Sequence, residues 1–422
     1  AISCHLLAVG TSTTPTNDTM QGFFRSTVRP GVALARHLTD AAAPLRKTPL
    51  HPTHIALGAK MAAFGGWDMP IQYPEGILKS HLHTREKAGL FDVSHMLGVV
   101  LRGADRVAFM ESLCVADIKS IPAGMGGLSV ITNKDGGIID DCIITNAGDH
   151  LYMVINAGHE TKDLPHMQEH LEQFVAKGGD VSVESLPENG ILALQGPKAA
   201  GVLQTLTKTD LSQVPFMAAQ TMQVAGLDCF VARSGYTGED GFEVAVPKGS
   251  SAQHGVVTLW EALMAHEDVK PVGLGARDSL RLEAGLCLYG NDLDDTTSPV
   301  EGSLLWVIAK RRRAEPGSFV GSERILRELQ EKSASRKRAG FVVGGGAPVR
   351  EGVTLFDAAG EEVGCTTSGS FSPCLKKGIG MCYVKPSCNK VGTELFAEVR
   401  GKKQMIVITK MPFVPQNYYR GP

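Results

Sequence analysis

The sequence lacks any long apolar run: no stretch approaches the roughly 18 residues that a membrane-spanning helix needs. It also lacks an excess of charge of either sign, because 42 Lys and Arg residues stand against 44 Asp and Glu residues, for a formal net charge of -2. A protein that binds nucleic acid generally carries a strong basic excess. We therefore expect neither a membrane nor a nucleic acid among the partners of this protein.

Cysteine pairs and the common cofactor motifs are missing too. The nine cysteines are odd in number and scattered, and no two are spaced as C-x-x-C, which argues against a disulfide framework or a structural zinc site and favours a reducing compartment. The sequence has no G-x-x-x-x-G-K-[ST], H-E-x-x-H or G-x-S-x-G motif, and no G-x-G-x-x-G after a predicted strand. We expect no metal, nicotinamide or flavin, and a chemistry that the substrates supply.

The N-terminal segment has the composition of a targeting sequence. From Met20 onward it carries several arginines among apolar residues, and Asp40 is the sole acid before Thr48. Such segments are typical of mitochondrial transit peptides, whereas a disordered tail, the alternative, usually carries both signs of charge. We interpret residues 1–47 as an N-terminal extension with a transit segment that begins at Met20 and is cleaved before Thr48. The expected location is the mitochondrial matrix.

Residues 48–320 alternate short strands and helices. The chain of 422 residues is long enough for two or three domains. The patterns predict strands at 128–132, 138–146, 151–155, 181–186, 191–194, 222–224, 229–232 and 242–246, and helices at 103–115, 160–175, 197–206 and 256–263. This order predicts an α+β fold with antiparallel sheets, in which a second unit repeats the theme of the first.

The C-terminal part has a different pattern. Residues 311–321 are basic and then contain Pro and Gly, as in a linker, and 322–338 have the charge pattern of a surface helix. Beyond Ala339, Gly-punctuated segments predict strands at 354–356, 362–366, 379–384, 394–399 and 404–409. We therefore expect 321–422 to form a linker helix and a small β-barrel or sandwich.

An acidic pair stands inside the apolar strand predicted at 138–146. Because strand side chains alternate between faces, Asp140 and Asp141 point to opposite sides, so that one can lie in solvent while the other enters a cleft. Buried carboxylates need partners. The alternative to a functional site is that both acids only bind nearby loops through hydrogen bonds.

Two further segments combine glycines with charged residues. In 234–244, Glu243 lies between Phe242 and Val244 and points away from these apolar side chains, as a solvent-facing strand residue also would. In the helix predicted at 275–285, Arg277 and Arg281 share a face at i,i+4 spacing, for which a salt-bridged surface is the common explanation.

Taken in order, these segments resemble one family. The sequences that carry the resemblance are Phe-Gly-Gly-Trp-Asp-Met-Pro at 64–70, Phe-Asp-Val-Ser-His-Met at 91–96, the run 136–141, Leu-Gln-Gly-Pro at 194–197, the segments 235–243 and 276–292, and Met-Pro-Phe-Val-Pro-Gln-Asn-Tyr-Tyr at 411–419. From about residue 48 to its end, the chain closely resembles the aminomethyltransferases, the T-proteins of the glycine cleavage system.

The resemblance implies an architecture and a reaction. The fold would comprise three domains around a central opening, two of them α+β and the last a β-barrel, with 48–320 as the folate-binding catalytic region. The reaction would transfer the aminomethyl group from the dihydrolipoyl arm of the lipoylated H-protein to tetrahydrofolate, a co-substrate. The products would be 5,10-methylenetetrahydrofolate, ammonia and dihydrolipoyl H-protein, and the other components of the system would be further partners.

The resemblance also implies roles for single residues. Asp141 matches the catalytic carboxylate, as a base or as an electrostatic anchor, with Asp140 facing the other way. Glu243 matches the residue that accepts the two adjacent donors of a pterin ring. The remaining substrate- and folate-binding positions implied are Asn156, Tyr236, Trp306, Arg277 and Tyr418. Tyr418 further implies that the C-terminal tail folds back onto the site.

Two alternatives share this architecture. A folate domain of the dimethylglycine or sarcosine dehydrogenase type carries a flavin-binding module ahead of it, whereas here about fifty residues without a Rossmann pattern precede the body. A non-enzymatic folate-binding protein of iron–sulfur maintenance carries Lys-Gly-Cys-Tyr-x-Gly, where this chain has the segment 285–292 around Cys287.

The remaining candidates have structural explanations. The basic runs 310–313 and 336–338 could contact the glutamate tail of folate or an acidic carrier protein, or form a solvated basic face. His95, Cys142 and Cys287 are interpreted as packing residues, because no second ligand or base is spaced to partner them.

Overall fold

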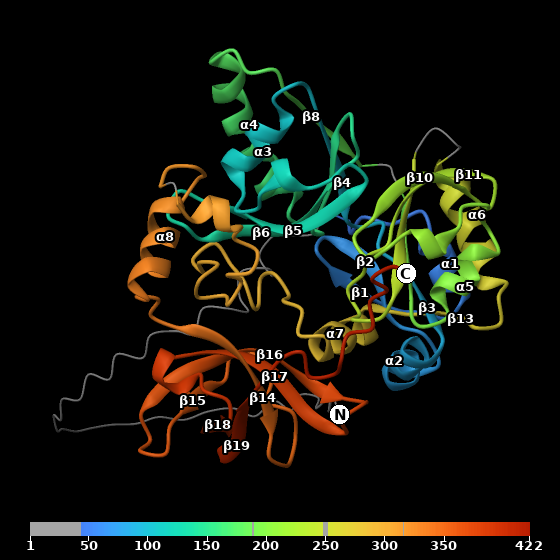
Figure 1. Cartoon of the computed structure of the whole chain (residues 1–422). Coiled ribbons are helices and arrows are strands. Elements are labelled where there is room, and N and C mark those ends of the chain that lie inside the picture. Colours follow the sequence, from blue (N-terminus) through green and yellow to red (C-terminus); the bar gives the residue numbers. More distant parts are fainter. Residues whose placement is uncertain (1–43, 188–189, 248–251, 315) are drawn as a thin grey trace, which may run out of the picture. The chain divides into compact units, whose positions relative to one another are not determined.

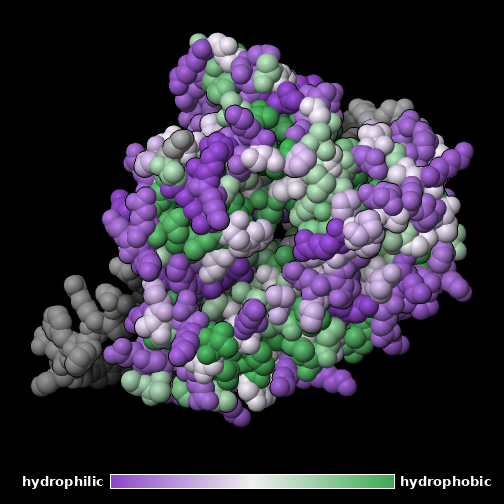
Figure 2. Space-filling model, viewed as in Figure 1, coloured by the Kyte–Doolittle hydropathy of each residue, from purple (hydrophilic) through white to green (hydrophobic). Residues whose placement is uncertain are grey.

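A computed structural model describes residues 44–187, 190–247, 252–314 and 316–422 (Figure 1). Residues from Pro44 onward form one compact unit. The predicted transit segment lies almost entirely in 1–43, outside the described residues, and stays a prediction. Among the described residues, no helix is long and apolar enough to cross a bilayer. Polar residues cover much of the face in Figure 2, and apolar residues are visible in a hollow near its middle.

The first sheet has five antiparallel strands in the order β5-β6-β7-β4-β8. They span Leu97–Arg102 (β4), Met125–Thr132 (β5), Ile138–Asn146 (β6), Leu151–Ile155 (β7) and Ser182–Leu186 (β8). The helices α3 (Arg106–Leu113) and α4 (Glu160–Ala176) pack on one face, where Phe109, Met110 and Met167 join the strand residues in a buried core. Burial of this apolar surface is what holds the two amphipathic helices on the sheet.

The turn between β5 and β6 explains the glycines that precede the acidic pair. Gly136 has a φ of 74°, which a residue with a side chain rarely adopts. A Cβ at Gly137 would lie 1.8 Å from the carbonyl oxygen of Asp295. Asn133 closes the turn, since its Oδ1 accepts hydrogen bonds from the backbone N–H groups of Asp135 and Gly137, both at 2.9 Å. The predicted strand–turn–strand is therefore confirmed.

The second sheet has six strands in the order β10-β11-β12-β9-β3-β13. They span Ala88–Asp92 (β3), Gly190–Gln195 (β9), Ala219–Val224 (β10), Leu227–Ala232 (β11), Gly241–Val246 (β12) and Val269–Pro271 (β13). The helices α5 (Ala199–Gln204) and α6 (Ala252–Met264) contribute to its core, which includes Trp260. Pairing is antiparallel except between β13 and β3. β3 precedes the whole first sheet in sequence, so the two sheets are not consecutive units of the chain.

Shorter elements bridge the second sheet and the C-terminal part. They are α1 (His51–Ala56), the hairpin β1 (Lys60–Phe64) and β2 (Trp67–Gln72), α2 (Gly76–Glu86) and α7 (Leu274–Glu283). The helix α7 carries Arg277 and Arg281. Leu282 of α7 packs against Ile379 and Met381 of the C-terminal strands. The helix thus contacts the elements on both sides of it.

The C-terminal strands close into a barrel, so that of the predicted barrel and sandwich the barrel is observed. They are β14 (Lys337–Val343), β15 (Thr354–Phe356), β16 (Glu362–Ser372), β17 (Lys377–Val384), β18 (Glu394–Val399) and β19 (Lys402–Thr409). The predicted helix 322–338 is too long, because α8 spans Ser322–Glu331 and Lys332 adopts a left-handed conformation. Arg338 lies in β14 instead, where its backbone pairs with Tyr383 of β17.

Candidate active site

The acidic pair lies on β6, in the middle of the first sheet. Asp141 and Asp140 stand opposite Val130 and Ile131 of β5. Asp140 is fully buried and faces α4, on the side of Cys142 and Ile144, whereas Asp141 is partly exposed. The alternation of faces holds, but the expectation that one of the two acids lies in solvent is wrong. Asp140 is enclosed by side chains from α4 and from the end of β7.

Asn156, which follows β7, joins the two acids. Its backbone N–H donates to Asp140 Oδ2 at 3.2 Å, and its Nδ2 donates to Asp140 Oδ1 at 2.9 Å. The same Nδ2 lies 3.3 Å from Asp141 Oδ1 and 3.1 Å from the backbone carbonyl oxygen of Asp141. The amide nitrogen of Asn156 is therefore engaged within the protein, where it fixes the orientation of both carboxylates.

The electrostatic environment separates the two acids. Burial raises the pKa of Asp141 to about 7, and the negative charge of Asp140 adds to the effect. For Asp140, burial is outweighed by interactions that include the hydrogen bonds from His159 and Asn156, so that its pKa lies below the ordinary value. Asp141 can consequently exchange a proton near neutral pH while its neighbour stays ionised.

A second group surrounds Tyr236, in the loop before β12. The guanidinium carbon of Arg277 lies 4.9 Å from the centre of the Tyr236 ring, and the Tyr236 hydroxyl donates to the carbonyl oxygen of Cys287. Burial lowers the pKa of Arg277, whereas the charge of Glu243 opposes the change. Among the described residues, the Nη1 of Arg277 has no hydrogen-bond partner although it is buried. A buried donor in this state is available to a ligand.

Glu243 points to the partly open face of β12, as its sequence neighbours predict. Phe242 and Val244 are fully buried, whereas Glu243 is partly exposed. Its Oε2 accepts a hydrogen bond of 2.8 Å from the hydroxyl of Ser234. Among the described residues, no donor binds the other carboxylate oxygen, which can accept donors from a bound molecule.

The structure couples five of the seven predicted site residues. Burial raises the pKa of Tyr236, and the charges of Asp141 and Arg277 both act on this phenol. Glu243 acts in turn on Arg277, and Asn156 binds Asp141. Two strands of different sheets and the first turn of α7 thus bring together side chains that are far apart in sequence.

Trp306 and Tyr418 lie outside this coupled group. Trp306 is 68% exposed, the largest value among the exposed large apolar residues described. Tyr418 stacks on Phe216, with ring centres 4.1 Å apart and planes 16° from parallel. The tail that carries Tyr418 does return toward the loop of Tyr236, because Asn417 donates to the carbonyl oxygen of Gly238 and to Glu239.

Arg281 has a structural role that differs from a surface salt bridge. Its side chain is 2% exposed, its Nη1 donates to Asp292 Oδ2 at 2.7 Å, and its Nη2 donates to the Ser368 hydroxyl of β16 at 2.8 Å. Asp292 also accepts from Thr367 and from the backbone of Leu288. This buried ion pair ties α7 to the barrel.

The basic runs also make internal contacts. Arg311 pairs with Glu111 and Asp117 at 2.6 Å each, and Arg312 is buried against the carbonyl oxygen of Glu111. Arg338 is buried as well, with its Nε donating to Gly302. Arg312 and Arg338 thus hold neighbouring segments together, whereas Lys310 and Arg311 are exposed, as in a solvated basic face.

Sequence reasoning missed several polar residues near the site. His95 Nδ1 and the Tyr152 hydroxyl are buried without a hydrogen-bond partner among the described residues. Burial lowers the pKa of His95 to about 4 and raises that of Tyr152, on which Glu243 also acts. His95 stands in the 91–96 motif, but Tyr152 offered no signal in its strand pattern. His159, just before α4, and Lys162 and Asp163 on α4 adjoin Asp140. Only their position just after Asn156 could have indicated them.

Two clusters of donor atoms could hold a metal ion by composition. His81, Glu283 and Cys374 form one, and Asp140, His159 and Asp163 form the other; within each, the ligand atoms lie within 4.8 Å of one another. In the first, Glu283 already binds Arg85 and the Ser372 hydroxyl. Burial raises the pKa of Cys374 to about 11, so its sulfur is a thiol at neutral pH.

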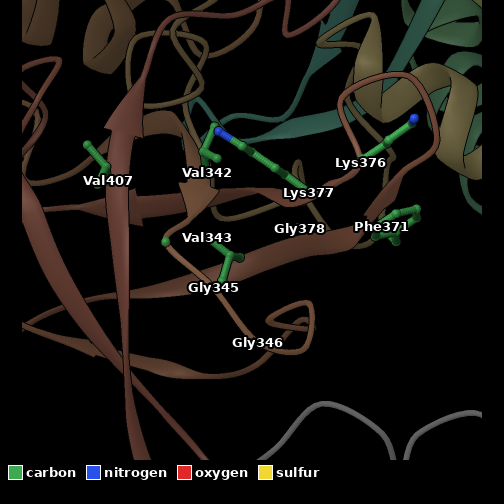
Figure 3. Close-up of a pocket in the computed structure, with 10 residues that line it drawn as sticks. Val342, Val343, Gly345, Gly346, Phe371, Lys376, Lys377, Gly378 and Val407 are labelled. Atoms are coloured by element: carbon green, nitrogen blue, oxygen red, sulfur yellow. The ribbon is translucent and has the colours of Figure 1, made fainter.

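Two cavities of the structure lie away from these residues. One of ≈ 310 Å³ opens on the barrel and is lined by the loop 344–346 and by Phe371, Lys376 and Lys377 (Figure 3). Another of ≈ 220 Å³ lies between Tyr73 and Met264. None of the predicted site residues lines either of them. The candidate site is therefore defined by its polar contacts.

The comparisons with known proteins identify the class. Residues 50–312 match the family described as the GCVT N-terminal domain, and residues 336–415 match the glycine cleavage T-protein C-terminal barrel domain. The chain belongs to the glycine cleavage T-protein family. A solved structure of aminomethyltransferase T from Bartonella henselae is 40% identical, with a TM-score of 0.82, and the match covers 89% of this chain and all of that one.

Curated relatives agree with this family. The mitochondrial aminomethyltransferase of Pisum sativum is 50% identical to this chain, and the match covers 92% of this chain and 94% of the relative. The enzyme of Dictyostelium discoideum is 48% identical, with 89% of this chain and 94% of the relative covered. The enzyme of Homo sapiens is 49% identical, with 92% of this chain and 94% of the relative covered. The predicted family, the α+β fold with its closed barrel, the aminomethyltransferase class and the mitochondrial location are confirmed. The names of these relatives favour neither the dehydrogenase-type folate domain nor the iron–sulfur maintenance protein.

Proposed function

We propose that this protein transfers the aminomethyl group carried on the dihydrolipoyl arm of a lipoylated H-protein to tetrahydrofolate. The carbon–sulfur bond of the S–CH2–NH2 unit breaks, and the carbon forms a bond to N5 of tetrahydrofolate. The carbon–nitrogen bond then breaks and N10 closes the ring. Of the two protons that leave N5 and N10, one ends on the lipoyl sulfur and one on the departing ammonia.

Asp141 supplies the carboxylate that this sequence of steps needs. Loss of sulfur leaves a carbon with iminium character, which a nearby negative charge stabilises, and N5 must lose its proton as it attacks. The observation that carries the proposal is the environment of Asp141 on β6. Its carboxyl is partly exposed, oriented by Asn156 and poised to exchange a proton near pH 7. Such a group can accept a proton and release it again within one turnover.

Glu243 and its neighbours bind the reduced pterin. The pterin presents N3–H and an exocyclic amine side by side, and one carboxylate can accept both hydrogen bonds. The hydroxyl of Ser234 donates a hydrogen bond to one carboxylate oxygen of Glu243. Tyr236 supplies an aromatic surface, and the unpaired buried Nη1 of Arg277 is directed to an acceptor on the ligand. Trp306, Tyr418 and the carbonyl oxygen of Asn156 complete the proposed contacts.

The H-protein and the other components of the glycine cleavage system are the proposed partners. Tetrahydrofolate is a co-substrate, and we propose no metal, nicotinamide or flavin for the reaction, because acid–base and electrostatic groups suffice for each step. The proposed folate-binding catalytic region is 48–320, followed by the linker helix and the barrel domain in 321–422, with 1–47 as the extension that includes the transit segment.

An ammonia-release assay tests the proposal. Aminomethylated H-protein is mixed with the purified protein, with and without tetrahydrofolate, and ammonia and methylenetetrahydrofolate are measured together. We expect the two products in equal amounts and only when tetrahydrofolate is present. Ammonia release that does not depend on tetrahydrofolate, or the absence of methylenetetrahydrofolate, would contradict the proposal. A flavin absorption band that is required for turnover would support the dehydrogenase-type alternative.

A further inference from the structure

The side of β6 that faces α4 carries a buried polar cluster to which the proposed reaction gives no role. Asp140 on β6, His159 just before α4 and Asp163 on α4 place one ligand atom each within 4.8 Å of the others. Both Asp140 and Asp163 are 0% exposed. Carboxylates are rarely buried this fully without a compensating interaction. The cluster lies directly behind the strand that presents Asp141.

Hydrogen bonds connect this cluster to Asp141. His159 Nδ1 donates to Asp140 Oδ1 at 3.2 Å, and Asn156 donates to the same oxygen at 2.9 Å. The Nδ2 of Asn156 is shared with Asp141 Oδ1 at 3.3 Å. The position of Asn156 therefore depends on Asp140, and the orientation of Asp141 depends on Asn156.

Asp163 lacks a donor of its own. Among the described residues, neither of its oxygens has a hydrogen-bond partner, although both are buried. The ammonium of Lys162 is 3.9 Å from Oδ1, but it donates to the carbonyl oxygen of Ile139 and lies 3.8 Å from the centre of the Tyr289 ring. Burial raises the pKa of Asp163 to about 10, and the charge of Asp140 contributes to the rise. A protonated Asp163 becomes a donor, and Asp140 is the acceptor beside it.

We infer that Asp163 holds a proton and donates it in a hydrogen bond to Asp140, and that Asp163, Asp140, His159 and Asn156 form a positioning network for Asp141. The network fixes the Asp141 carboxylate and keeps one permanent negative charge behind it. The role given to Asp141 rests on the proposed function; the proton on Asp163 does not. Asp163, Asp140 and His159 are positioning residues, since none of the three is required to touch the substrate.

The charges around Asp141 set the direction of the expected effects. The titratable groups that interact with it are Asp140 and Cys142 on its own strand, Lys162 and Asp163 on α4, Tyr236 before β12, and Cys287 after α7. Of these, Asp140 is the anion that raises the pKa of Asp141, and Lys162 opposes it. Removal of the charge on Asp140 therefore lowers the pH at which Asp141 ionises.

Three variants test the network through the rate and its pH dependence. For Asp140→Asn, the acid limb of kcat for ammonia release should move down by roughly one pH unit. Asp163→Asn keeps a donor and should retain activity within about threefold, whereas the similarly sized Asp163→Leu should lower kcat by roughly 10-fold to 100-fold with the Kd for tetrahydrofolate unchanged. Glu169→Gln, an exposed position on the same helix, is the control and should match the wild type.

An infrared measurement tests the proton itself without any turnover. At pH 8.5, where Asp141 is ionised, the wild type should show one carboxylic acid C=O band that Asp163→Asn abolishes and Glu169→Gln leaves in place. The absence of this band in the wild type overturns the inference whether or not the protein is active. Equal losses in Asp163→Asn and Asp163→Leu, or an unmoved acid limb in Asp140→Asn, would also overturn it. Activity lost on treatment with a chelator and restored by a divalent cation would show the three residues to be metal ligands instead.

Discussion

The exchange of Glu243 for Ala should weaken the binding of tetrahydrofolate much more than it affects the fold. Glu243 lies on the open side of β12, between two fully buried residues that hold the strand in the core of the second sheet. Its side-chain hydrogen bond comes from Ser234, which is itself buried. Truncation therefore removes an acceptor pair for the ligand without leaving a cavity in the core.

The size of the effect follows from the hydrogen bonds lost. A hydrogen bond to a charged group contributes about 1.5–3 kcal/mol, and the pterin donors stay unpaired when the carboxylate is removed. Because Glu243 is partly exposed and water can replace it in part, we take about 2–3 kcal/mol for both bonds together. At 1.4 kcal/mol per factor of ten, Kd should rise by roughly 30-fold to 150-fold.

Titration calorimetry with tetrahydrofolate measures this change directly. The control is Asp228→Asn, which removes an exposed carboxylate from β11 of the same sheet. In the ammonia-release assay, the KM for tetrahydrofolate should rise by a similar factor while kcat changes by less. A Kd within twofold of the control, or a loss confined to kcat, would refute the assignment of Glu243 to the pterin.

Two further predictions concern residues around the site. Asp292→Ala should lower the free energy of unfolding by about 3–5 kcal/mol in urea titrations, because it leaves the 2% exposed Arg281 without its buried partner. The control, Glu323→Ala on the surface of α8, should have little effect on this free energy. If Asp292→Ala lowers it by less than about 1 kcal/mol, the role of this ion pair is contradicted. Cys287→Ala should retain the rate of ammonia release within about threefold, since burial raises the pKa of this thiol to about 12 and leaves it unreactive. Complete loss of ammonia release in this variant would favour a cysteine-centred function.

Local patterns predicted those parts of the fold whose contacts are close in sequence. The helix expected at 160–175 is observed at Glu160–Ala176, and the strands expected at 128–132 and 138–146 are observed as β5 and β6. The pairing of β3 with β9 and β13 could not be predicted in this way, because it joins strands more than 90 residues apart. The helix at 322 was drawn too long for a related reason. No Gly or Pro marks its end, and Arg338 is committed to β14 by contacts with Gly302 and β17.

In the candidate site too, local patterns predicted the faces of the strands but not the contacts made by distant parts of the chain. Alternation along the strand correctly separated Asp140 from Asp141 and Glu243 from its apolar neighbours. It could not reveal that Asp140 is enclosed, because the groups that enclose it, Asn156, His159 and side chains of α4, come 16 or more residues later. The burial of Arg281 and of Arg338 likewise depends on partners from other parts of the chain. Period and spacing define the face of an element, and only the folded chain defines what covers that face.

The most direct measurement is single-turnover ammonia release by Asp141→Asn, paired with its tetrahydrofolate Kd. The variant keeps the shape of the side chain and one acceptor but removes the charge and the basic oxygen. A carboxylate that stabilises the cationic carbon and accepts a proton is worth about 10²–10⁴ in rate. We predict a rate lower by that factor with a Kd within about threefold of the wild type. A rate near that of the wild type would contradict the role proposed for Asp141.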